Sequence, residues 1–168
     1  TARPGDGSIT ARSIAILVAD GMLGAGATAV RAALLAQGAV PRFVAPRIGR
    51  VKTSDGETVV AEASLENEPG FLFDALVLTD GADGIAVLSE DDHTMGFIQD
   101  HYRHGKALLV LGEASCLLEQ AGLPGQLPNG EVDPGIVSSD GADPASLHAF
   151  IKAIARHRHP EREIPGGN

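Results

Sequence analysis

Ile14-Ala-Ile-Leu-Val-Ala19 is a continuous apolar run, as is typical of a strand that is buried on both faces of a parallel sheet. From Gly24 to Gln37, Ala, Val and Leu recur at helical spacing until Gly38 ends the pattern. A buried strand that leads into a helix is the unit from which parallel sheets are built. We therefore expect an α/β fold.

Strands and helices are predicted to alternate through the rest of the chain. The patterns predict strands at 40–45, 73–78, 107–111 and 135–138, a helix at 89–104 with Ser89 as its N-cap, and helices at 113–120 and 143–157. Residues 51–60 have the pattern of a hairpin that turns at Asp55-Gly56. This order indicates a right-handed, doubly wound parallel sheet with a small β-hairpin, in a single domain.

The composition argues against several classes of function. The chain has 168 residues, and its 22 acidic and 13 basic residues give a formal net charge of −9. That charge disfavours binding to nucleic acid or to anionic membranes. No apolar stretch approaches the roughly 20 residues that cross a bilayer, and residues 1–8 lack the apolar segment of a signal peptide. We expect a soluble chain, and its compartment is not specified by the sequence.

The two ends of the chain differ from its centre. Residues 1–12 are polar and contain Pro and Gly, so we expect a linker or a mobile N-terminus there. Residues 158–168 are charged and rich in Pro and Gly, so we expect a C-terminal arm. The folded domain is then expected at 13–157, with a Pro-rich loop at 123–134.

The only cysteine, Cys116, is a candidate nucleophile. In α/β hydrolases the nucleophile occupies the sharp turn directly after a strand. Here that position is Gly112, whereas Cys116 lies four residues later, beside Leu117 and Leu118. One turn into a helix, a free cysteine is expected to pack as a small buried side chain. The alternative is a reactive thiol.

Gly24-Ala-Gly-Ala-Thr-Ala29 matches the G-x-G-x-x-A pattern of dinucleotide-binding folds. Residues 20–23 separate it from the preceding strand, whereas that motif needs its glycines at the strand end. After the second strand, only a 2′-phosphate interpretation through Arg47 remains. Phosphate or nucleotide binding stays open as an alternative to close packing of the helix on the sheet.

The 6 histidines form no pattern that indicates a metal site. His101 with His104, and His157 with His159, lie near the ends of predicted helices, where a positive charge complements the helix dipole. A metal would need a convergent set of ligands with supporting hydrogen bonds. We therefore expect no metal and no cofactor in this domain.

Over residues 13–164 the chain resembles the flavodoxin-like DJ-1/PfpI group, relatives of class I glutamine amidotransferases. The resemblance implies an acidic residue after the first strand, and Cys-His-Gly where a later strand meets a leucine-rich helix. Aligned on Leu111-Gly-Glu-Ala-Ser-Cys-Leu-Leu118, the Cys and His positions fall on Gly112 and Glu113, and the acidic position falls on or beside Leu23. The resemblance thus implies a flavodoxin-like fold with degenerate catalytic positions and no catalytic residue.

A narrower resemblance rests on four segments: Ile16-Leu-Val-Ala-Asp20, Arg47-Ile-Gly-Arg-Val51 leading to Asp55-Gly56, Gly135-Ile-Val-Ser-Ser-Asp-Gly-Ala-Asp143, and the basic tail from Ala155 to Pro165. In order and spacing they are similar to the C-terminal domain of large-subunit haem catalases. That resemblance implies contacts with the catalase core and with neighbouring subunits of a tetramer. It also implies that the haem, and the decomposition of hydrogen peroxide, belong to the core.

The expected role is therefore non-catalytic: a contribution to tetramer stability and to shielding the approach to the haem channels. A holdase activity toward unfolded proteins is a further expectation, because detachment from the core would uncover Leu123, Leu127 and Ile164. Two alternatives stay open. One is a free-standing DJ-1/PfpI-like hydrolase or glyoxalase that uses Cys116, and the other is a phosphate or nucleotide module at residues 24–29.

Overall fold

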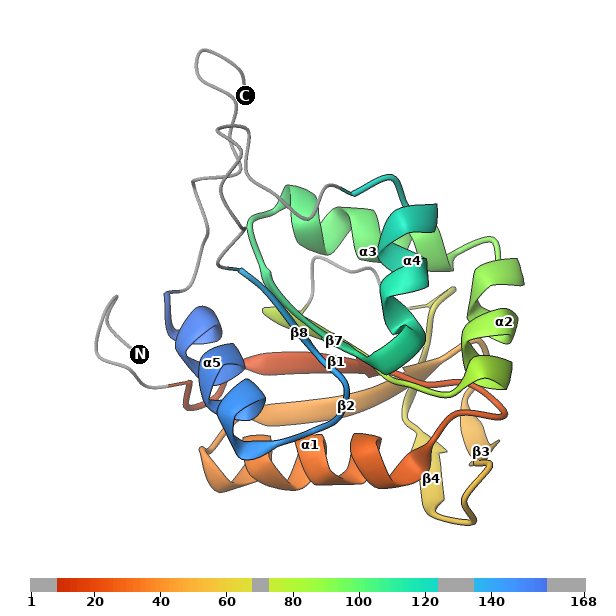
Figure 1. Cartoon of the computed structure of the whole chain (residues 1–168), viewed down its shortest axis with the longest axis horizontal. Helices are drawn as coiled ribbons and strands as arrows, with labels where there is room; N and C mark the ends of the chain where they lie inside the picture. The colour runs from red at the N-terminus through yellow and green to blue at the C-terminus, as the bar shows by residue number, and fades with distance from the viewer. Residues whose placement is uncertain (1–8, 68–72, 124–134, 157–168) are drawn as a thin grey trace.

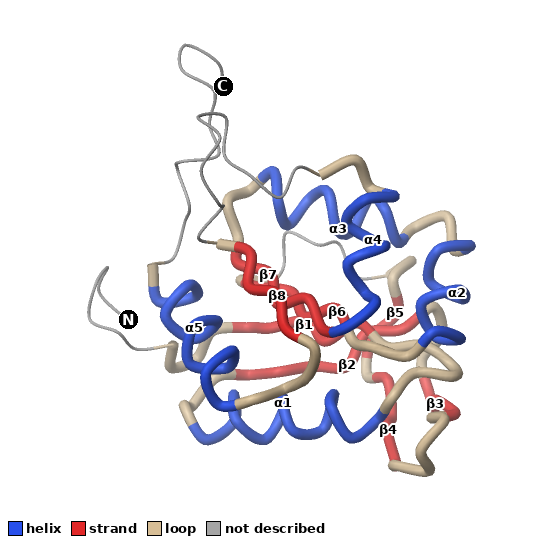
Figure 2. Tube along the Cα trace, viewed as in Figure 1, coloured by secondary structure: helices blue, strands red, loops and turns tan. Residues whose placement is uncertain are grey.

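The central sheet has six parallel strands in the order β5-β2-β1-β6-β7-β8 (Figures 1 and 2). The computed structural model describes residues 9–67, 73–123 and 135–156. The strands are β1 (Ser13–Leu17), β2 (Val40–Ala45), β5 (Ala63–Ser64), β6 (Ala75–Leu78), β7 (Ala107–Leu111) and β8 (Ile136–Ser139). The strand order reverses at β1, which pairs with β2 on one side and β6 on the other, so the predicted doubly wound sheet is confirmed.

Helices cover both faces of this sheet (Figures 1 and 2). One face carries α1 (Gly24–Ala36) and α5 (Pro144–Ala155), and the other carries α2 (Ala82–Glu90), α3 (Thr94–Arg103) and α4 (Ser115–Gln120). Strand β1 contributes to both cores: Ile14 and Ile16 belong to the first, and Ala15 and Leu17 to the second. Successive side chains of a strand point to opposite faces, so a strand between two cores is apolar at every position.

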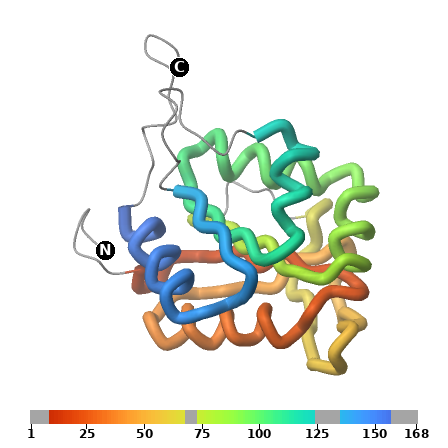
Figure 3. Tube along the Cα trace, in the orientation of Figure 1, coloured from red at the N-terminus to blue at the C-terminus, as the bar shows by residue number. Residues whose placement is uncertain are grey.

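The predicted hairpin is confirmed as an antiparallel pair, β3 (Gly49–Lys52) and β4 (Thr58–Ala61), outside the main sheet. Val51 and Val59 face each other and are buried, whereas the neighbouring residues of both strands are exposed or half-buried, apart from Ala61. The hairpin lies beside the N-terminus of α1 (Figure 3). A Cβ atom at Gly24 would lie 2.6 Å from Cβ of Glu57, so this close approach requires glycine.

One predicted helix is wrong in its extent. Instead of a single helix at 89–104, the structure has α2 and α3, and Ser89 lies inside α2. The Ser89 hydroxyl donates to the carbonyl of Ala86 (2.8 Å), so it bonds back into its own helix and does not cap the next one. The break between the helices is made by Asp91, which is extended and accepts a hydrogen bond from the amide of His93 (2.9 Å).

The last helix begins as predicted. The carboxylate of Asp143 accepts a hydrogen bond from the amide of Ser146 (2.7 Å), and Pro144 follows the cap directly. Helix α5 ends at Ala155; the predicted end at 157 lies outside the described residues. At the other end of the chain, Ile9 is buried in the same core as α5, within the segment expected to be a linker.

Candidate functional site

The loops that follow β1, β6 and β7 meet at the carboxyl edge of the sheet, where α/β folds bind their ligands. Glycines allow the first two loops to pack closely. A Cβ atom at Gly81 would lie 2.6 Å from Cα of Met22, and one at Gly84 would lie 2.8 Å from Cβ of Met22. Leu23 and Asp80 are thereby held next to each other, and the amide of Leu23 donates to the carbonyl of Asp80 (2.9 Å).

Gly112 follows β7 directly and has a φ of +56°, in the left-handed region. A sharp turn at this point is what lifts a nucleophile above the sheet in α/β hydrolases. Here a Cβ atom would lie 2.0 Å from Oδ2 of Asp80 and 2.2 Å from its Cγ. The space that a nucleophilic side chain would need is therefore filled by a carboxylate.

Asp80 also occupies the backbone donors of this turn. Its Oδ1 accepts hydrogen bonds from the amides of Gly81 (2.8 Å) and Glu113 (3.0 Å). Two amides that converge on one oxygen resemble an oxyanion hole, which stabilises negative charge on a reacting substrate. In this chain the negative charge is supplied by the protein itself. Asp80 thus contacts all three positions that the alignment identified as degenerate: it is bonded to Leu23 and Glu113 and fills the space above Gly112.

Sequence reasoning did not identify Asp80. The available signal was its place directly after the buried strand β6, because polar residues at the carboxyl end of a parallel strand lie where ligands bind. Of the three predicted positions, Leu23 is apolar and 41% exposed, Gly112 has no side chain, and Glu113 is exposed. Together they offer one carboxylate, with neither a thiol nor an imidazole.

The prediction that Cys116 is buried is wrong, because its side chain is exposed. Helix α4 buries Leu117 and Leu118, and the adjoining turns bury Ala114 and Ala121. At about 100° per residue, these four side chains centre on one direction, and Cys116 points about 150° away from it. The thiol therefore faces solvent on the side of α4 opposite the sheet.

The N-terminus of α1, proposed above as a phosphate site, is also bonded to a carboxylate of the chain. Asp55, at the tip of the hairpin, accepts hydrogen bonds from the amides of Gly24 (3.1 Å) and Ala25 (2.9 Å). The bond from Ala25 is the main cause that lowers the pKa of Asp55 below its usual value. A phosphate at residues 24–29 would have to displace this carboxylate from the first two amides.

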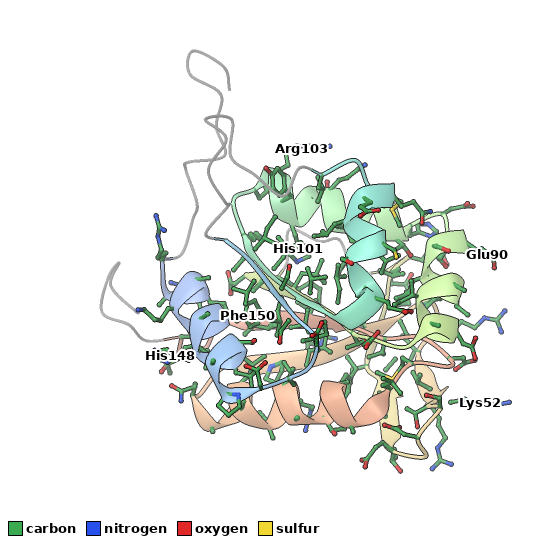
Figure 4. The ribbon with its side chains drawn as sticks, viewed as in Figure 1. Lys52, Glu90, His101, Arg103, His148 and Phe150 are labelled. Atoms are coloured by element: carbon green, nitrogen blue, oxygen red, sulfur yellow. The ribbon has the colours of Figure 1, made fainter. Side chains whose placement is uncertain are left out.

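The prediction that His101 complements a helix dipole at the surface is wrong, because the side chain is completely buried (Figure 4). Its ring lies against Phe97 (5.0 Å between centroids) and Phe73 (6.4 Å). Nδ1 is 2.9 Å from the carbonyl of Phe97, and Nε2 has no hydrogen-bond partner among the residues that the structure describes. Burial lowers the pKa of His101 to about 4, with smaller contributions from Lys106 and His104.

The remaining predictions concern the apolar surface residues, a metal site and a membrane-spanning helix. Leu123 is half-buried and packs on the core beneath α2, α3 and α4, while Leu127 and Ile164 lie outside the described residues. In the part of the chain that the structure describes, no three His, Cys, Asp or Glu side chains converge on a point that could hold a metal. None of the described helices is both long enough and apolar enough to span a membrane.

Several solved structures share this fold. A ThiJ/PfpI family protein from Pseudomonas syringae superposes with a TM-score of 0.71 over 89% of this chain and 70% of its own, at 21% identity. Oxidised DJ-1 from Toxoplasma gondii gives a TM-score of 0.69 over 87% of this chain and 95% of its own, at 16% identity. These similarities confirm the flavodoxin-like fold.

Comparison of sequences identifies a narrower family than comparison of structures does. Residues 10–164 match the family model described as the C-terminal domain found in long catalases. The chain belongs to this family. Among curated relatives of this long-catalase domain, Catalase HPII of Pseudomonas putida is 33% identical over 95% of the chain, and Catalase-1 of Neurospora crassa is 30% identical over 97%. The chain spans only 21% and 25% of these two relatives, so most of each catalase has no counterpart here.

Proposed function

We propose that this domain is non-catalytic, and that it stabilises the tetramer of a long catalase and shields the approach to the haem channels of the catalase core. One observation carries the non-catalytic part of the proposal: the carboxylate of Asp80 fills the space above Gly112 and accepts a hydrogen bond from the amide of Glu113. A substrate oxyanion would have to displace a group that is covalently part of the chain. Intramolecular ligands of this kind compete at a high effective concentration, so they disfavour substrate binding.

The second carboxylate, Asp55 at the N-terminus of α1, supports the same proposal. Helix N-termini and strand-to-helix turns are the two places where flavodoxin-like folds usually hold anions. Because an aspartate of the chain is bonded to the amides at both places, the carboxyl edge of the sheet is less available to an anionic ligand. The haem of the parent's core would supply the chemistry of peroxide decomposition, and we assign no residue of this chain to that step.

The enzymatic alternative, a hydrolase or glyoxalase that uses Cys116, has less support. The described His and acidic groups provide no partner for the thiol: within the described part of the chain no hydrogen bond to the sulfur of Cys116 is formed, and the side chain points to solvent. A nucleophilic thiol needs a base or an anion-stabilising group within hydrogen-bond reach. Of the three residues proposed to bind unfolded proteins, only Leu123 lies within the described residues. Its half-buried side chain offers a small apolar surface to such a client.

Removing the domain from its parent catalase tests the proposed function. We expect the truncated tetramer to dissociate at a lower urea concentration, measured by analytical ultracentrifugation. We also expect peroxide turnover per haem to persist for as long as the tetramer does. The isolated 168-residue chain should not decompose peroxide. If the truncated and full-length tetramers dissociate at the same urea concentration, the stabilising role is refuted.

A further inference from the structure

A cavity of about 330 Å³ opens where the carboxyl ends of β1 and β2 meet the hairpin and α2. Arg47 and Ile48, after β2, contribute to its lining together with Arg50 of β3 and Val87 of α2. Asp20 is the carboxylate of the lining, and its Oδ1 accepts the amide of Lys52 (2.9 Å). In Figure 4, Lys52 extends away from the body of the protein on this side, and Glu90 marks the end of α2.

The guanidinium groups of Arg47 and Arg50 form no hydrogen bond, ion pair or ring contact with the described residues. Each of the other described arginines has an interaction partner. The contacts include Arg31 over the ring of Phe43, Arg42 over the ring of Phe73, and Arg103 beside Asp100, and Arg12 and Arg156 also have partners. In a chain with a net charge of −9, these two neighbouring arginines keep their positive charges available to carboxylates of a partner.

An apolar surface lies between these charges. Ile48 is 61% exposed, the largest fraction among the large apolar side chains that the structure describes, and Val87 is 39% exposed. Both line the same cavity as the two arginines. Arginine beside exposed aliphatic side chains is typical of protein interfaces, where the apolar centre supplies affinity and the charged rim supplies specificity.

We propose that this cavity docks an acidic segment of the remaining part of the parent chain. Carboxylates of that segment pair with Arg47 and Arg50, and an apolar side chain of the segment packs against Ile48 and Val87. The inference rests on the proposed function. The chain spans about a fifth to a quarter of its catalase relatives, so a tethered partner is present at a high effective concentration. Charge complementarity selects an acidic segment of it.

Site-specific cross-linking in the full-length parent tetramer tests the docking. A photoreactive p-benzoylphenylalanine in place of Ile48 should cross-link to a peptide outside this domain that carries Asp or Glu near the linked residue. The matched control places the same group at Leu35 of α1, which is 46% exposed and distant in sequence, and should not link to that peptide. A link from position 48 to the same cavity of a second copy, or no link at all, overturns the proposal.

Charge reversal provides the second measurement. In the parent tetramer, Arg47→Glu with Arg50→Glu should accelerate proteolytic release of the domain by about tenfold or more, whereas Arg103→Glu on α3 should not. Equal release rates overturn the docking surface. Its failure is distinguishable from failure of the proposed function. If position 48 cross-links as expected but deletion of the domain leaves tetramer stability unchanged, only the stabilising role is refuted. If position 48 does not cross-link but deletion lowers tetramer stability, only the docking surface is refuted.

Discussion

Replacing Gly112 by Cys should destabilise this domain by an amount that depends on Asp80. Two costs add in the native chain. A φ of +56° costs an L-residue about 1–2 kcal/mol. The new Cβ atom, 2.0 Å from Oδ2 of Asp80, forces the carboxylate to move, and overpacking of this kind costs about 1–3 kcal/mol. The expected loss is therefore about 2–5 kcal/mol, a large share of the 5–15 kcal/mol that stabilises a typical protein.

The cost should fall when the carboxylate is removed. In an Asp80→Gly background only the backbone strain remains, so Gly112→Cys should cost about 1–2 kcal/mol. The difference, about 1–3 kcal/mol, is the coupling energy between the two positions. Asp80→Gly has its own cost, because it leaves the amides of Gly81 and Glu113 without this acceptor; the single variant measures that cost separately.

Urea unfolding of the four proteins measures the coupling, in a Cys116→Ser background so that the introduced thiol is the only one. The same proteins provide a functional readout. In the double variant the introduced thiol lies near the amides of Gly81 and Glu113, which favour a thiolate, so it should label faster at neutral pH than in the single variant. If Gly112→Cys costs the same in both backgrounds, Asp80 does not fill the turn.

Two other predictions concern stability. Because burial lowers the pKa of His101 to about 4 in the folded chain, against 6.5 for the free side chain, protonation does not weaken the fold above pH 6.5, and the free energy of unfolding falls as the pH falls toward 4; at pH 5.5 the loss is about 1 kcal/mol. His101→Leu should flatten this dependence in urea unfolding, whereas replacement of the exposed His148 should not, and an unchanged slope in His101→Leu would falsify the assignment. Asp55→Ala should lower the melting temperature by a few degrees, because the first amides of α1 lose their acceptor, while Asp140→Ala should not. Equal melting curves for those two variants would show that the hairpin does not cap the helix.

Some misjudged positions could have been predicted correctly from local sequence. The direction of Cys116 follows from its place in the helix. Successive side chains are about 100° apart, so when Leu117 and Leu118 both face the core, the side chain before them points away from it. The break between α2 and α3 was present in the sequence as Asp91, a residue whose side chain competes with helical hydrogen bonds. His101 is different. Its position near a helix end suggested a surface role, and only the packing of Phe73 and Phe97 around it shows that it is buried.

The sequence by itself determined the parallel sheet, the two-sided burial of β1, the hairpin and the Asp143 cap. Each of these depends on hydrophobic periodicity or turn chemistry within a few neighbouring residues. Only the tertiary structure decided the state of the candidate site. Asp80 bonds to an amide 33 residues away and Asp55 to amides 30 and 31 residues away. No local pattern specifies which aspartate reaches which amide, because that choice depends on how the parallel strands and the hairpin bring distant loops to one edge of the sheet.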